Sequence, residues 1–179
     1  MITGGKVLLR PRHDADVAVL HENLYENVAT RAGADTRPWL PRTPSASPYA
    51  VAESDETIAF FSVQERDSGE LAGACELWGV DAQQRSAHLG VAILPGHRRR
   101  GLATDVVAAL CEYGFAVRGL HRLNVETLTD NTGMITAATR AGFVHEGVRR
   151  QTQWVYGDWK DEAVLGLLAA DWFQSRRQA

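Results

Sequence analysis

The sequence predicts an α/β or α+β fold in which helices pack on one mixed β-sheet. Strand-like segments occur throughout the chain, one long segment has helical apolar spacing, and several strands follow one another without a helix between them. Strands that follow one another through short turns pair antiparallel, so this order does not fit an all-parallel dinucleotide-binding sheet.

The first half of the chain is expected to contain one helix, with a second helix after it as an option without assigned bounds, and several strands. The helix spans residues 15–25 and follows Asp14, an acidic residue that can cap its start. A turn at residues 67–70 contains Gly69 and indicates a hairpin between the strands on either side of it. The strands expected here span residues 6–10, 58–66, 71–78 and 87–94.

The second half is expected to contain two helices and three more strands. A long helix over residues 101–117 is indicated by an apolar stripe with helical period. The stripe consists of Leu102, Val106, Ala109 and Tyr113. A second helix begins after Asn131, which can cap it, and ends at Gly142. The strands span residues 122–128, 143–154 and 159–168, the last two joined by a turn at 156–158.

Composition argues against nucleic acid or a membrane as the partner. The 179 residues carry a formal net charge of -3, whereas domains that bind duplex nucleic acid are usually basic. No apolar run approaches the length of a bilayer span, and the N-terminus lacks the apolar core of a signal peptide. We therefore expect one domain over residues 1–179, a cytoplasmic location, and a monomer or a homodimer.

The two cysteines are isolated in the sequence. Cys75 and Cys111 form no CxxC pair and have no neighbouring histidines with metal-ligand spacing. We expect both to be buried free thiols, and we expect no metal site.

The run HRRRGLAT, residues 97–104, is the clearest functional signal. It places three arginines and Gly101 between a predicted strand and a predicted helix. A helix start exposes unpaired N–H groups, glycine allows a ligand to approach them, and arginine adds forked bonds to phosphate. The run therefore indicates a pyrophosphate site. A solvated basic turn and a nucleic-acid patch are the alternatives.

The segment Arg98–Ala103 resembles the [Q/R]-x-x-G-x-[G/A] pyrophosphate loop of the GNAT superfamily of acyl-CoA-dependent N-acyltransferases. Later segments are similar to the RimJ/RimL branch, which acetylates N-terminal amines of ribosomal proteins. These segments are residues 121–123, 129–131, 141–143, 146–147, 156–161 and 171–172.

The resemblance implies a splayed mixed sheet of about seven strands with flanking helices. Acetyl-CoA would be the cosubstrate, with its pantetheine arm between the strands at 87–94 and 122–128. The residues implied to contact it are Val91, Ile93, Leu94, Arg98, Arg99, Arg100, Gly101, Leu102, Ala103, Thr104, Asn131 and Met134. Asn131 could equally be a plain helix cap, and the two roles are compatible.

The sequence departs from the family at its catalytic positions. Ala138 occupies the place of the tyrosine acid that many members carry. The serine and glutamate of RimL-type enzymes are replaced by Met134 and Gln153. No catalytic role is therefore carried over from the family.

Two carboxylates within strands remain as catalytic candidates. Glu126 and Glu76 lie in the middle of otherwise apolar strands, where a carboxylate is costly unless it is exposed, paired or functional. Either could bind or deprotonate the amine, and either could be an exposed or ion-paired residue. His88 is a weaker candidate base, because it lies one residue out of phase with the family's bases.

The absence of an obvious strong base favours an acceptor amine of low pKa. Deprotonation at pH 7.4 costs under ~1 kcal/mol for an α-amine and about 4 kcal/mol for a lysine amine. The favoured acceptor is therefore a protein N-terminus. The aromatic residues expected to contact it are Trp39, Trp78, Trp154 and Tyr156, each with core or hairpin packing as the alternative.

Two other functions stay open. The chain could acetylate a small molecule, such as an antibiotic, a polyamine or an amino-acid analogue, with the Pro-rich segment at 37–48 as a lid. It could also be a CoA-binding regulatory domain without activity, since Met134, Ala138 and Gln153 replace family catalytic residues.

Overall fold

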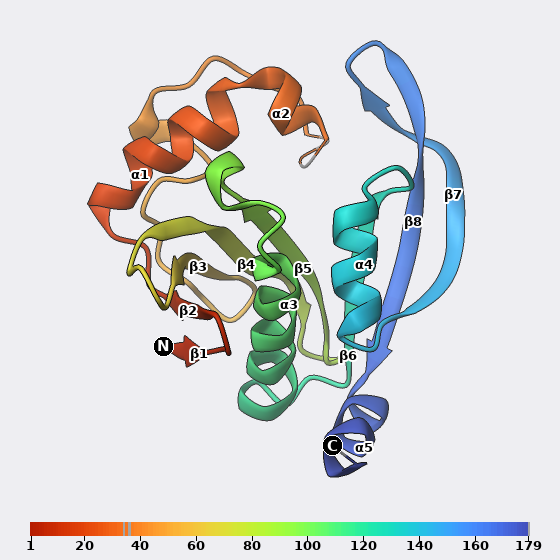
Figure 1. Cartoon of the computed structure of the whole chain (residues 1–179). Coiled ribbons are helices and arrows are strands. Elements are labelled where there is room, and N and C mark those ends of the chain that lie inside the picture. Colours follow the sequence, from red (N-terminus) through yellow and green to blue (C-terminus); the bar gives the residue numbers. More distant parts are fainter. Residues whose placement is uncertain (34, 36, 179) are drawn as a thin grey trace.

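The computed structural model contains one eight-stranded sheet with the order β1-β2-β3-β4-β5-β6-β8-β7 (Figure 1). It describes residues 1–33, 35 and 37–178; Ala34, Thr36 and Ala179, which the predicted single domain includes, lie outside the described residues. The strands are β1 Ile2–Thr3, β2 Val7–Arg10, β3 Ala59–Glu65, β4 Leu71–Asp81, β5 Ser86–Ile93, β6 Arg122–Leu128, β7 Val144–Val155 and β8 Asp158–Leu168.

The helices are α1 Asp14–Leu20, α2 Val28–Ala32, α3 Leu102–Glu112, α4 Thr132–Arg140 and α5 Ala169–Gln178. A π-helical segment, His21–Glu26, continues α1, and a second one, Tyr113–Val117, continues α3. The mixed α/β prediction is confirmed, since β5 and β6 pair parallel while their other neighbours pair antiparallel.

Differences from the predicted elements have local causes. The strand count is eight rather than about seven because β1 has two residues, too few to show alternation. Asp14 is not the helix cap: His13 precedes α1, and the Asp16 carboxylate accepts a hydrogen bond from the His13 amide at 2.9 Å. The predicted order left a place for a second helix after the first, without bounds, and α2 lies there; α5 was not predicted.

The predicted apolar stripe of α3 is buried against the sheet. Leu102, Val106 and Ala109 belong to the main core, and Tyr113 packs against it at partial exposure. Figure 1 shows α3 and α4 side by side, with α1 and α2 in a separate group. The start of α3, where the arginine run ends, is therefore fixed by the core of the protein.

The sheet is splayed between β5 and β6. These strands pair only from Ser86–Arg122 to His88–Asn124, whereas β5 stays paired with β4 as far as Ile93. Along its whole length β6 pairs with β8. The two halves of the sheet therefore separate beyond His88, which confirms the splayed sheet.

Cys75 and Cys111 are buried and form no disulfide, as predicted. Burial raises the pKa of both thiols, that of Cys111 to about 12. Within the described part of the chain, no helix is long and apolar enough to cross a membrane.

Candidate active site

The arginine run forms a tight turn at the entrance to α3. A short 3₁₀ turn, Pro95–His97, follows β5 and leads into the run. Gly101 is the N-cap of α3 with φ 80°, and Arg99 has φ 63°. The left-handed backbone at Gly101 favours glycine, because a Cβ is strained there. The turn thus presents the unpaired amides at the start of α3, including those of Ala103 and Thr104.

The three arginines are not equivalent. The guanidinium of Arg100 forms an ion pair with Glu65 at 2.7 Å, so much of its charge is already compensated. Arg98 donates from Nε to the Ile93 carbonyl at 3.0 Å. Among the residues that the structure describes, no carboxylate lies within 4.0 Å of the Arg98 or Arg99 guanidinium. These two exposed side chains fit an anionic group, and Arg100 fits it less well.

Lys6 is a basic residue of this turn that the sequence analysis missed. Its Nζ donates to the Arg100 carbonyl at 3.2 Å and would lie 3.2 Å from a Cβ at Gly101. The carboxylate of Asp105, in the first turn of α3, accepts hydrogen bonds from the amides of Gly5, Lys6 and Val7. These hydrogen bonds join residues 5–7 to Arg100 and Asp105, which are far apart in the sequence, so no local pattern predicts them.

The directions of the N–H and C=O groups show which residues of β5 face the splay. The Leu94 amide donates to the Ala72 carbonyl on the β4 side at 2.9 Å. Main-chain groups alternate between the two sides of an antiparallel strand, so those of Val91 and Ile93 face β6. Val91 and Ile93 therefore fit the predicted contact with a pantetheine arm. Leu94 does not, because its amide is used by β4 and its carbonyl accepts from His97.

The residues on α3 and α4 differ in what they can offer a cofactor. Leu102 is buried in the core, so only its main chain faces the turn. Asn131 caps α4 by accepting from the Met134 amide at 3.2 Å, and it donates to Thr127 Oγ1 at 2.9 Å. The helix-cap role of Asn131 is confirmed, while its contact with pantetheine stays a prediction. Met134 packs against the main core.

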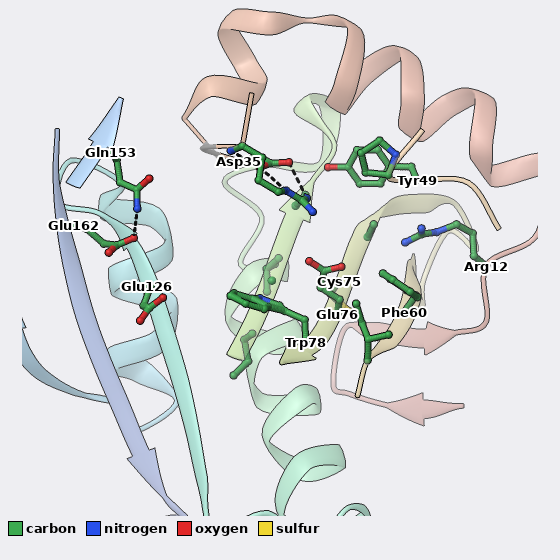
Figure 2. Close-up of a pocket in the computed structure, with 18 residues that line it drawn as sticks. Arg12, Asp35, Tyr49, Phe60, Cys75, Glu76, Trp78, Glu126, Gln153 and Glu162 are labelled. Atoms are coloured by element: carbon green, nitrogen blue, oxygen red, sulfur yellow. Dashed lines mark hydrogen bonds and ion pairs between the residues drawn. The ribbon is translucent and has the colours of Figure 1, made fainter. Parts of the chain in front are cut away.

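A pocket of about 530 Å³ lies at the splay (Figure 2). It extends from β4 and β5 across to β6, β7 and β8, and the segment before β3 covers one side. Its lining includes Arg12, Asp35, Arg37, Pro48, Tyr49, Ile58, Phe60, Ala74, Cys75, Glu76, Trp78, Leu89, Gly90, Val91, Ala92, Glu126, Gln153 and Glu162.

Glu76 lies on β4 in the wall of the pocket, next to β5. It pairs with Gly90 across β4 and β5, and a Cβ at position 90 would lie 2.9 Å from Glu76 Oε1. Among the described residues, no cation lies within 4.0 Å of its carboxylate. Burial raises the pKa of Glu76, and the positive charges of Arg37 and Arg12 oppose the increase. Glu76 is therefore a desolvated carboxylate in the wall of the pocket.

Glu126 lies on β6, across the splay from Glu76 (Figure 2). Its Oε1 accepts from Arg149 at 2.8 Å, and Arg149 also pairs with Glu162 at 2.9 Å. This matches the ion-paired alternative for Glu126. His88 stacks on Trp78 with ring centroids 4.5 Å apart, and its Nδ1 lies 3.8 Å from Glu126 Oε2. A catalytic role for Glu126 stays a prediction.

The positions that carry catalytic residues in the family hold other chemistry here. Ala138 is fully buried in the core next to α3. Gln153 lines the pocket and donates to Glu162 at 2.6 Å. Neither Ala138 nor Met134 lines the pocket.

The structure brings only one of the four predicted acceptor aromatics into the pocket. Trp78 lines it, whereas Trp39 lies outside and donates from Nε1 to the Tyr25 carbonyl at 3.1 Å. Trp154 and Tyr156 lie at the β7–β8 hairpin end, where Trp154 packs on Trp159 at 5.3 Å. Position near a turn therefore did not predict which way the side chains point.

Several pocket residues were not predicted from the sequence. Arg12 follows β2, Tyr49 lies in the irregular stretch between α2 and β3, and Phe60 lies in β3; none of them belongs to a family motif. Asp35 and Arg37 reach the pocket as an ion pair with Nη2 and Oδ2 2.8 Å apart. The Pro-rich segment at 37–48, expected as a lid over a small-molecule site, begins at Arg37 and ends at Pro48, and both of these residues line the pocket. No sequence signal marked Arg12, Asp35 or Tyr49.

Comparison with known proteins identifies the class of enzyme. Residues 6–144 match the acetyltransferase (GNAT) domain family, which is well over half of the chain. The chain therefore belongs to the GNAT acetyltransferases, enzymes that transfer an acetyl group from acetyl-CoA to an amine. The residues of the arginine turn and of the β5 edge fit a CoA diphosphate and its arm.

Relatives differ in the acceptor that their names give. The uncharacterized N-acetyltransferase YoaA of Bacillus subtilis is 32% identical over 120 residues, about two thirds of either chain. A spermidine N(1)-acetyltransferase of Escherichia coli is 26% identical over 161 residues, 90% of this chain and 85% of that protein. The ribosomal protein uS5-alanine N-acetyltransferase of Escherichia coli is 21% identical over 98% of this chain and 94% of that protein.

Solved structures show the same fold. The spermidine N-acetyltransferase of Vibrio cholerae in complex with CoA and spermine has a TM-score of 0.83 at 19% identity, covering 94% of this chain and 98% of that chain. A GCN5-related N-acetyltransferase of Brucella melitensis has a TM-score of 0.78 at 26% identity, covering 98% and 81%.

Proposed function

We propose that the protein acetylates a small primary amine, with Glu76 as the base that removes the amine proton. The observation that carries this proposal is the desolvated Glu76 carboxylate, which lies against Gly90 in the wall of the pocket. A carboxylate with a raised pKa is a stronger base than an exposed one, and it stays ionised at neutral pH if the increase is moderate.

The residues of the site supply most of what acyl transfer needs. The thioester of acetyl-CoA supplies the acyl group and a thiol that can leave as a thiolate. The amides that face β6 at Val91 and Ile93 are suited to polarise the thioester carbonyl. Glu76 would accept the proton that the amine loses as its nitrogen bonds to the carbonyl carbon. The starting turn of α3, with Arg98 and Arg99, would hold the diphosphate.

The geometry favours a small acceptor over a protein N-terminus. The sequence-based preference for an α-amine rested on the absence of a base, and Glu76 removes that reason. The 530 Å³ pocket is covered by residues before β3, including Tyr49, which suits a compact ligand. One relative is named for spermidine and another for a ribosomal protein, so a small amine and a protein N-terminus are the two acceptors to compare. RimJ/RimL-type acetylation of an N-terminus is the competing outcome.

Thiol release from acetyl-CoA tests this proposal directly. Small amines and short peptides with free N-termini are compared at equal concentration, and we expect kcat/KM to be higher for small amines. Higher values for the peptides would restore the N-terminal acceptor. CoA binding without turnover on any amine would indicate the inactive regulatory domain.

Substitution of the two carboxylates identifies the base. Glu76→Gln is expected to lower kcat by about 100-fold or more, with little change in the affinity for CoA. The acidic limb of the wild-type kcat/KM profile should lie above the ordinary glutamate pKa and disappear in this variant. Glu126→Gln is the matched comparison, and a larger loss there than in Glu76→Gln would assign the base to Glu126.

A further inference from the structure

Arg12 is a buried cation that the proposed reaction does not use. It follows β2, is 9% exposed, and lines the pocket. Figure 2 shows its guanidinium directed into the pocket near Tyr49, Phe60 and Glu76. A side chain that is always charged has therefore been withdrawn from water and turned toward the acceptor space.

The protein compensates this charge only weakly. The guanidinium donates to the carbonyls of Ala50 and Phe61, both at 3.4 Å, and its Nε is buried without a hydrogen-bond partner. The rings of Tyr49 and Phe60 lie 5.8 Å from its central carbon. Within the described residues, no carboxylate lies within 4.0 Å of it. Burial accordingly lowers the pKa of Arg12, with Glu76 and Tyr49 opposing the decrease.

The other charged groups of the pocket are paired with one another. Arg37 is bound by Asp35 through two hydrogen bonds of 2.8 and 2.9 Å. Across the splay, Arg149 pairs with both Glu126 and Glu162. The two charged groups left without an ion pair at 4.0 Å among the described lining residues are therefore Arg12 and Glu76, one of each sign.

A ligand that satisfies both groups must carry both charges. A buried guanidinium gains most from a carboxylate, which can accept two of its N–H groups at once. The amine of the same molecule would lie at Glu76, which is the group that deprotonates it. A polycation would place a second positive charge near Arg12, so it matches this pocket less well.

We propose that the acceptor is an amino carboxylate, whose carboxylate binds Arg12 while its amine faces Glu76. This inference rests on the proposed acetylation of a small amine and specifies the acceptor class. Arg12 is then a specificity-determining residue, and it contributes to binding rather than to proton transfer.

A matched panel of acceptors tests the carboxylate subsite without any substitution. The panel consists of α-, β- and γ-amino acids, each beside its own carboxamide, with spermidine and a peptide amide added. We expect the best amino acid to exceed its carboxamide in kcat/KM by about 10- to 100-fold, the range for hydrogen bonds to a charged group. The difference should appear mainly in KM.

Substitution of Arg12 assigns that preference to one side chain. Arg12→Gln should bring the acid-to-amide ratio close to one, because the amino acid loses its carboxylate partner and the carboxamide has no such partner to lose. Arg12→Lys keeps the charge without the fork and should give an intermediate ratio. Arg42→Gln, an exposed arginine that donates to the Ala46 carbonyl outside the pocket, should leave the ratio unchanged. Calorimetry with CoA checks that each variant is folded.

The possible failures are distinguishable. Turnover of amines with an acid-to-amide ratio near one, or with spermidine as the best acceptor, would overturn the carboxylate subsite and leave the proposed function standing. An unchanged ratio in Arg12→Gln would also overturn it. No turnover on any acceptor would overturn both proposals. If Arg12→Gln does not fold, the wild-type ratio and the Arg12→Lys variant decide.

Discussion

The arginine turn at the start of α3 and the pocket at the splay are built in different ways. The arginine turn, residues 97–101, comes from one short stretch of chain between β5 and α3, and its shape depends on the backbone at Arg99 and Gly101. The acceptor pocket draws on positions from Arg12 to Glu162 and depends on contacts between distant segments. A site made by a contiguous stretch is visible in the sequence, whereas an assembled site becomes visible only when the chain is folded.

The largest expected effect is at the backbone of the arginine turn. Gly101→Val places a β-branched residue at φ 80° and beside Lys6 Nζ, and it covers the amides at the start of α3. We expect the affinity for CoA to fall by about 100-fold, because such strain alone costs about 1–3 kcal/mol. Calorimetric titration with CoA measures the change.

Gly96→Ala is the matched control for this substitution. Gly96 lies in the turn before the arginines, and a Cβ there would have no heavy atom within 4 Å. An equal loss of affinity in both variants would show that the turn is sensitive to any change, and the backbone explanation would be wrong.

The second effect is on the stretch between β2 and β3, part of which covers the pocket, where Asp16 of α1 ties the chain to the sheet. Asp16 pairs with Arg10 at 2.7 Å and accepts from Ser62 Oγ on β3 at 2.8 Å. Burial raises the pKa of Asp16, but bonds from Arg10, the His13 amide and Ser62 outweigh it and lower the pKa to about 2. The stability from this lowered pKa is present above about pH 4 and is lost as pH falls toward 2; it amounts to about 2 kcal/mol.

Asp16→Asn should therefore lower the free energy of unfolding by about 2–4 kcal/mol at neutral pH, since it leaves Arg10 unpaired. The variant should also lose part of the pH dependence between pH 4 and 2. Urea unfolding across that range measures both quantities. Asp14→Asn, at an exposed position of the same helix, is the control. If the free energy of unfolding depends on pH equally in wild type and Asp16→Asn between pH 4 and 2, this explanation is wrong.

A smaller effect is expected from the arginines of the turn, whose substitutions should lower the affinity for CoA to different extents. Arg98→Gln and Arg99→Gln should each weaken CoA binding by about 10-fold and reduce its salt dependence, because neither guanidinium is ion-paired with a carboxylate among the described residues. Arg100→Gln should weaken binding less, since Arg100 is paired with Glu65. Titrations at several salt concentrations measure this. A larger loss in Arg100→Gln would reverse the order that the ion pair implies.

The smallest effect is expected at the hairpin end. Trp154→Ala and Tyr156→Ala remove exposed side chains that do not line the pocket, so we expect less than about a twofold change in kcat/KM. Trp78→Ala, which removes a lining residue, should lower kcat/KM by about 10-fold through lost acceptor contacts. A large loss from Trp154→Ala would bring the hairpin into the acceptor site.

Much of the fold could be predicted because local patterns determine it. The stripe from Leu102 to Tyr113 predicted α3, and the turn around Gly69 predicted the hairpin of β3 and β4. The start of α1 was misplaced because Asp16 caps the helix from its third position, through a contact that also involves β3. The splay was implied by family resemblance, since no local pattern records where two parallel strands separate.

The site divides in the same way. Gly101 and its arginines were predicted as a unit, although the sequence could not show that Glu65 would neutralise Arg100. Glu76 and Glu126 were selected by the same argument about carboxylates in apolar strands. Only the folded chain distinguishes them, because Arg149 from β7 pairs with Glu126 and no such partner reaches Glu76 among the described residues. No sequence pattern marks Arg12 as a site residue. Only the fold shows that its side chain is buried and lines the pocket.

Because Glu76 packs against Gly90, the residues allowed at positions 76 and 90 depend on each other. A methyl group at position 90 would lie 2.8 Å from Glu76 Cγ, so it would displace the carboxylate from the strand edge. A side chain at position 90 therefore requires Glu76 to move away from the strand or to be replaced by a shorter residue, and either change alters where this carboxylate lies. Mutational libraries should show strong epistasis between the two positions, and homologues should co-vary there.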